Sequence, residues 1–196
     1  MSLAIALALG APGAWAHGTI PGINQFYNGL LHPLVAPAHL LSLLALALLA
    51  GQQTHRKLAH EMIGLAVGLL VGVLGAGWTG DPDTDRVLWL AAVVTGLLVA
   101  LGRELPAWLR LGVGGLIGCA VGLASADVSL RGSARISALI GAMLGALILV
   151  GELSVLVEAA LKRWHHPALR IGVRVLASWL TACALLMGVL ALKRAM

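Results

Sequence analysis

The chain has 196 residues, of which 60% are hydrophobic and 11% are charged. Soluble domains carry about 25% charged residues, and a small globule could not bury so much apolar surface. The composition therefore excludes an ordinary soluble domain and predicts an integral membrane protein. The net charge of +5 fits basic loops beside a membrane, so we expect no nucleic-acid partner.

The first sixteen residues differ from the rest of the chain. An apolar run from Leu3 to Leu9 is followed by Ala14, Trp15 and Ala16, a small-x-small pattern typical of signal-peptide cleavage sites. We expect residues 1–16 to be a signal peptide that is removed before His17. Residues 17–196 are then expected to form a single domain.

Six apolar runs follow, each near the roughly 20 residues that a helix needs to cross a bilayer. They cover residues 27–50, 58–78, 87–104, 107–125, 135–159 and 168–192. The sequence predicts an all-α polytopic membrane bundle with six transmembrane helices. With the N-terminus outside, the inner loops hold more Lys and Arg residues than the outer side, and this bias favours that orientation.

Small residues recur at every fourth position in three of these runs. They are Gly64, Gly68 and Gly72, then Gly114, Gly118 and Gly122, and finally Ser137, Gly141 and Gly145. Such faces let helix backbones approach closely, so we expect a tight bundle, with a homo-oligomer as a further option. Tryptophans near the ends of the runs are predicted interfacial anchors, namely Trp78, Trp89, Trp108 and Trp164.

Two histidines and two prolines interrupt the first apolar run. On a straight helix His32 and His39 would lie about 10 Å apart along the axis, too far for one metal ion with nitrogen ligands near 2 Å. Either Pro33 and Pro37 break the helix and bring the imidazoles together, or each histidine serves a separate step of a pathway. Imidazole suits Ni, Cu, Zn and Co. The structural alternative is a pair of histidines hydrogen-bonded across the bundle.

Other polar residues could assist such a site. Cleavage would make His17 the N-terminal residue, whose α-amine and ring could chelate a metal together. Glu152 lies inside the fifth run, where we expect it to face the bundle interior and to act as a relay or cation ligand. His60 and Glu61 begin the second run as an exit site or as interfacial polar residues. No catalytic or phosphate-binding motif occurs, so we expect no enzyme, and no cofactor is firmly indicated.

The first run resembles the HupE/UreJ family, whose motif reads His-Pro-x-x-Gly-x-Asp-His in a helix that follows a signal peptide. His32, Pro33 and His39 match this motif. Two positions depart from it, because the family glycine is Ala36 and the family aspartate is Ala38. The aspartate is an anionic ligand, and its loss removes charge that would offset a divalent cation in a low dielectric.

The resemblance implies a small membrane permease for nickel of the kind encoded with hydrogenase and urease systems. A second family element, His-Gly-x-Glu after the fourth span, corresponds to residues 124–128, where Asp127 is an approximate substitute and a possible relay. We therefore expect a secondary permease for a divalent transition metal, nickel before Co, Cu or Zn, with His32, His39 and His17 as ligands. The alternative is a non-transporting membrane subunit that packs against a partner complex, with histidines that are structural or hold a cofactor such as haem.

Overall fold

The computed structural model describes residues 22–53, 58–76, 83–125, 130–164 and 167–195, and every regular element within these ranges is a helix. The helices are α2 (Gln25–Val35), α3 (Pro37–Gln52), α4 (Leu58–Gly75), α5 (Thr84–Leu101), α6 (Ala107–Ala124), α7 (Gly132–Arg163) and α8 (Pro167–Ala195). The all-α prediction is confirmed for the described part of the chain.

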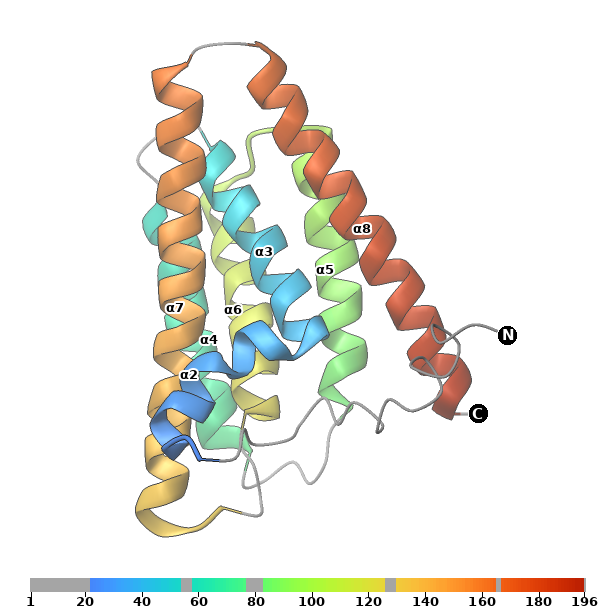
Figure 1. The fold of residues 1–196 in the computed structure, drawn as a ribbon. Coiled ribbons are helices and arrows are strands. Elements are labelled where there is room, and N and C mark those ends of the chain that lie inside the picture. The colour runs from blue at the N-terminus through green and yellow to red at the C-terminus, as the bar shows by residue number, and fades with distance from the viewer. Residues whose placement is uncertain (1–21, 54–57, 77–82, 126–129, 165–166, 196) are drawn as a thin grey trace, which may run out of the picture.

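The helices pack around α3, which lies between α7 and α5 (Figure 1). On the far side of α5 lies α8, while α4 and α6 lie side by side behind α3 and α7. Short α2 lies across the lower part of α7. The helices α7 and α8 are closest at one end of the bundle and diverge toward the other end.

The lengths and apolar surfaces of these helices fit a membrane bundle. Four helices, α5, α6, α7 and α8, are long and apolar enough to cross a bilayer, and the bent pair α2–α3 is a fifth candidate if it counts as one span. The remaining apolar helix, His60–Gly75 within α4, is shorter. Large apolar side chains are widely exposed, such as Leu74 (67%) and Leu90 (65%), as expected for surfaces that contact lipid.

The predicted glycine faces of α4 and α6 meet each other. Added Cβ atoms at Gly64, Gly68 and Gly72 would overlap the main chain of α6, and Cβ atoms at Gly114, Gly118 and Gly122 would overlap the main chain of α4. Both helices run in the same direction, because Gly64 faces Leu111 and Gly72 faces Cys119. The backbones are therefore in van der Waals contact along most of their length, as such faces allow.

A second pair, α2 and α7, packs in the same way. An added Cβ at Gly141 or Gly145 would overlap the main chain at Phe26 or Leu30, and one at Gly29 would overlap the main chain at Ala138. The glycines that the sequence offered as helix-packing faces are thus used within a single copy of the chain.

The prediction that Trp89 is an interfacial anchor is wrong. Trp89 is only 8% exposed and packs against Gly188 of α8, so it belongs to the core and is not an interfacial anchor. The missing side chain at Gly188 leaves the space that the indole fills. Trp108 and Trp164 are 72% and 58% exposed near helix ends, as the anchor prediction requires, and Trp78 lies outside the described residues.

Candidate metal-binding site

The break between α2 and α3 follows from its prolines. Pro37 disfavours the helical conformation of the residue before it, and Ala36 accordingly is extended, with φ −80° and ψ 113°. Pro33 and Pro37 also lack the N–H that each would donate to the carbonyl four residues earlier. The two helix axes therefore differ by 71°.

This break brings the two predicted histidines together. His32 lies in the last turn of α2 and His39 in the first turn of α3. Their ring centroids are 4.9 Å apart and the ring planes are inclined by 55°. The sequence left two arrangements open, and the structure has the one in which the broken helix pairs the imidazoles.

The separation of the rings is compatible with one ion bound by two nitrogens. Nitrogen ligands lie about 2.0–2.1 Å from zinc and similar ions, which puts each ring centroid about 3.2 Å from the metal. Two such rings stand about 4.5–5.2 Å apart when the ligand–metal–ligand angle lies between about 90° and 109°. The observed 4.9 Å falls within this interval.

The histidines lie away from solvent. His39 is 0% exposed, His32 is half-buried, and the Nε2 of His32 is buried together with both ring nitrogens of His39. Ser42, also fully buried, donates a hydrogen bond of 2.9 Å to the carbonyl of His39 and so supports the first turn of α3. An ion that enters this site must exchange part of its hydration shell for protein ligands.

The partial charges at the two helix ends largely cancel at the histidines. The C-terminal end of α2 carries a partial negative charge that favours a cation, and the N-terminal end of α3 carries a partial positive charge that opposes it. Within the described residues, no group of three or more His, Cys, Asp and Glu side chains could hold a metal ion. The two imidazoles are neutral donors, which suit Ni, Cu, Co or Zn better than Mg or Ca.

A further polar side chain of α2, Asn28, was not among the predicted ligands. It precedes His32 by one helical turn, so the two side chains lie on the same face of α2. Its Nδ2 donates a hydrogen bond of 3.1 Å to the carbonyl of Ile23. Just before this helix, Asn24 accepts a hydrogen bond from the N–H of Phe26 at 3.1 Å and caps the first turn. The i, i+4 spacing to His32 was the available signal.

Glu152 does not lie where we predicted it. It is exposed on the outer face of α7, and the interior at this level is occupied by Val150 and Ser154, both 0% exposed. Residues two positions apart lie about 200° apart around a helix, so an interior that contains 150 and 154 excludes 152. Two other predicted site residues, His17 and Asp127, lie outside the described residues.

A buried ion pair joins the first turns of α4 and α6. The Nε and Nη2 atoms of Arg110 donate hydrogen bonds of 2.5 and 2.6 Å to the two carboxylate oxygens of Glu61. Their side chains are 1% and 0% exposed. From the sequence, Glu61 was expected at an exit site or as an interfacial polar residue, and no partner was predicted for it. The glycine rows give the packing faces of the two helices, and the register in which the structure pairs these rows puts Glu61 and Arg110 at the same level.

The ion pair and the histidines occupy opposite ends of α3. His39 is in the first turn of that helix, and the chain reaches Glu61 shortly after the helix ends at Gln52. Between these ends Leu43, Leu46 and Leu49 are all 0% exposed. Packed apolar side chains therefore lie along α3 between the histidines and the ion pair.

These features define a helical membrane protein whose first long apolar segment is broken between two closely spaced histidines, of which His39 is buried and His32 is half-buried. Residues 5–190 match the family described as HupE / UreJ protein, and the chain belongs to that family. The family is one of membrane proteins related to nickel and cobalt transport and is not an enzyme family. Comparison with curated proteins and with solved structures gave no match.

Proposed function

We propose that this protein is a secondary permease for a divalent transition metal, with nickel as the expected cargo and cobalt, copper and zinc as the next candidates. His32 and His39 receive the ion at the break between α2 and α3. The observation that carries this proposal is the 4.9 Å separation of two imidazoles in a proline-broken membrane helix. Ionisable or ligating side chains inside a membrane segment are usually functional.

Two histidines do not complete a coordination shell, because these metals bind four or more ligands. We propose that Asn28 supplies a side-chain oxygen from the turn of α2 before His32. The α-amine and ring of His17 are further candidate donors if the signal peptide is cleaved. Water molecules would supply the rest.

In this proposal the chain crosses a bacterial inner membrane six times, with α2 and the histidines on the periplasmic side. The bent pair α2–α3 and α4 supply the first and second crossings, and α5 to α8 supply the others. Movement of the ion is driven by its own gradient or by a coupled one. Glu152 and Asp127 stay candidate relays, although the outward position of Glu152 makes a relay within a single copy less direct.

A second candidate function is a non-transporting membrane subunit whose histidines are structural or hold a cofactor. Two observations favour it. The fully buried Leu43, Leu46 and Leu49 follow His39 along α3, and Ala38 provides no carboxylate next to His39. This function predicts stable co-purification with a larger assembly and no metal uptake.

The test is metal content and metal-dependent melting of the purified protein in detergent. A ligand that binds only the folded state raises stability by RT ln(1 + [L]/Kd), so Ni²⁺ should raise the melting temperature of the wild type. The double substitution His32→Ala/His39→Ala should abolish this rise, whereas His60→Ala in α4 should keep it. The proposal fails if the wild type neither binds metal nor melts differently with it. Uptake into proteoliposomes then separates the permease from the second candidate.

A further inference from the structure

Glu152 is an acidic residue on a surface that is otherwise apolar. Its neighbours on the outer face of α7 are Ile148 (55% exposed), Val155 (53%) and Leu156 (64%), and Glu152 itself is exposed. It lies about 16 Å before Arg163, measured along the helix axis at about 1.5 Å per residue. This depth puts the carboxyl group inside the hydrocarbon and not at the headgroups.

An acid in this position is unfavourable if the surface faces lipid. Acidic residues within membrane helices almost always face protein or a water-filled cavity, since a charge at the helix centre costs about 2.5–3.5 kcal/mol in insertion measurements. The interior of this bundle at the same level holds Val150 and Ser154 instead. The face of α7 around Glu152 therefore fits a protein contact outside the single chain.

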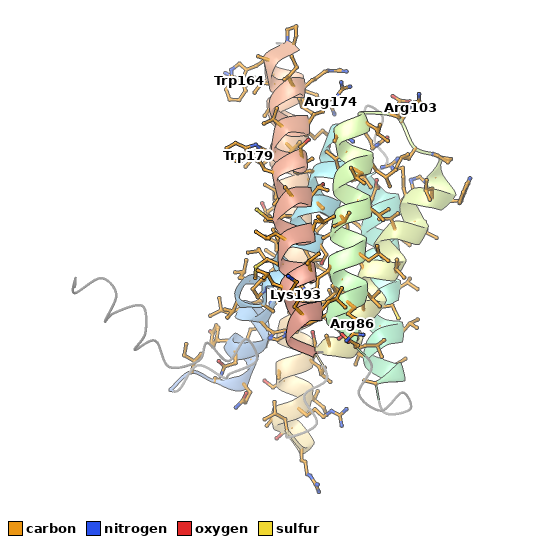
Figure 2. The ribbon with its side chains drawn as sticks, turned by 90° about the vertical axis from the view of Figure 1, so that its right-hand side faces the viewer. Arg86, Arg103, Trp164, Arg174, Trp179 and Lys193 are labelled. Carbon is orange, nitrogen blue, oxygen red and sulfur yellow. The ribbon has the colours of Figure 1, made fainter. Side chains whose placement is uncertain are left out.

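The complementary surface is on α8. Only 11% of its most apolar stretch is buried within the chain, against 39% for α7 and 44% for α5. Trp179 is 70% exposed on this helix, and Figure 2 shows it projecting away from the bundle, well below Trp164 and toward the middle of the helix. Its distance from Pro167 is about 18 Å along the axis, close to the depth of Glu152.

A tryptophan at this depth is also unusual. Tryptophan favours the headgroup level, where its indole N–H finds polar partners. In hydrocarbon that N–H needs an acceptor, and a carboxyl oxygen is an acceptor whether the acid is ionised or protonated. Glu152 thus offers the hydrogen-bond acceptor that the indole N–H of Trp179 requires. The two residues lie on different helices, however, and the outer faces of these helices do not pack on each other within one copy.

We propose that this chain self-associates, with the outer face of α7 around Glu152 packed against the outer face of α8 around Trp179 of a second copy. The Trp179 indole donates a hydrogen bond to the Glu152 carboxyl group across this contact. The occupant is a second copy because the chain itself provides the donor at a similar depth. The glycine faces do not provide the contact, since they pack α4 on α6 and α2 on α7 within the copy.

The two contacting surfaces are different, so the contact is head-to-tail. Such contacts either close into rings or continue as open chains. Every copy then uses both its α7 face and its α8 face, and covalent capture across the contact should produce species larger than a dimer.

The test uses cysteine cross-linking of the full chain in liposomes. Cys119 and Cys183 are first replaced by Ala, and Glu152→Cys and Trp179→Cys are then introduced together. Mild oxidation should give a ladder of covalent multimers. A control pair combines Glu152→Cys with Trp108→Cys, because Trp108 is similarly exposed (72%) but lies on α6, and this pair should stay monomeric.

The hydrogen bond is tested separately by the strength of self-association in detergent, measured by light scattering or native mass spectrometry. Trp179→Phe and Glu152→Leu should each weaken association by about three- to thirtyfold, the range for one interhelical hydrogen bond in membranes. Glu152→Gln retains an acceptor and should stay close to wild type. A monomeric wild type at all protein concentrations, or equal ladders from both cysteine pairs, would overturn the proposal, as would capture of a different membrane protein at Glu152.

Discussion

The α4–α6 pair and the α2–α3 segment use opposite means to fit a membrane. In α4 and α6 the helices are continuous, the glycines let the backbones touch, and the polar side chains Glu61 and Arg110 satisfy each other. In α2 and α3 the helix is broken and two histidines are brought together at the break. The first region holds the bundle together, and the second provides groups that can bind a ligand.

The largest effect should come from breaking the buried ion pair. Arg110→Ala leaves the carboxylate of Glu61 buried without its bidentate partner, and loss of one partner of a buried pair costs about 3–5 kcal/mol. We expect a much lower melting temperature in detergent. The control is Arg86→Ala, since Arg86 pairs with Asp83 on the surface, where both side chains are about half exposed, and should change stability by about 1 kcal/mol or less. Equal melting of both variants would contradict a stabilising role for the buried pair.

Two glycines of α6 provide a matched test of the tight packing. An added methyl at Gly118 overlaps the main chain at Leu65, whereas one at Gly112 meets nothing within 4 Å. Overpacking costs about 1–3 kcal/mol, so Gly118→Ala should be destabilised by at least this amount. Gly112→Ala should be neutral or slightly stabilised, because alanine is the better helix former. Thermal unfolding checks both, and similar behaviour of the two variants would argue against close backbone contact.

Removal of the prolines should separate the histidines. In Pro33→Ala/Pro37→Ala the missing N–H groups are restored and the restriction on Ala36 is lifted, so the helix can continue. His32 and His39 would then lie about 10 Å apart along the axis. We expect the affinity for Ni²⁺ to fall at least tenfold, measured by calorimetry, with the fold retained. Pro106→Ala, just before α6, is the control. If the affinity for Ni²⁺ is unchanged in both variants, metal binding does not depend on the break between α2 and α3.

The smallest expected effect comes from substitution of Asn28, the proposed oxygen donor, and concerns the affinity for Ni²⁺. Asn28→Asp keeps the shape of the side chain and adds a negative charge one turn from His32, which should raise the affinity for Ni²⁺ by about tenfold, since ligand charge tunes metal affinity. Asn28→Ala should lower it. Asn24→Asp, one turn earlier, changes the same residue type at the helix cap and should have little effect. If Asn28→Ala binds like the wild type while His32→Ala does not, Asn28 is not a ligand.

The helices and their packing faces were predictable because the glycines recur at a helical spacing in the sequence. The rows Gly64–Gly68–Gly72 and Gly114–Gly118–Gly122 indicate which face of each helix is packed, and the structure pairs them. The pairing of Glu61 with Arg110 was not predicted, since it depends on which helices are neighbours and on their register. Glu152 was misplaced for a related reason, because a single polar residue in an apolar run does not show which side of the helix faces protein.

The approach of the two histidines could be anticipated from the prolines, but the geometry of the pair could not. The prolines predict a break, and the restriction on Ala36 predicts extended angles there. The direction of the bend depends on what α2 packs against, and that partner is α7, more than 100 residues further along the chain. Local sequence therefore indicated where the helix ends, and the distance between the rings was left to long-range packing.

The two histidines are carried by helices that pack on different parts of the bundle. His32 is carried by α2, which is fastened to α7 through Gly141 and Gly145, while His39 is carried by α3, which also packs on α5. A single extended residue, Ala36, joins the two helices. Because α3 packs on both α7 and α5, any movement of α3 relative to α7 alters the spacing of the imidazoles, and an ion bound by both rings would favour one arrangement of these helices over others. By linkage, the arrangement of the bundle and the affinity for the ion must depend on each other.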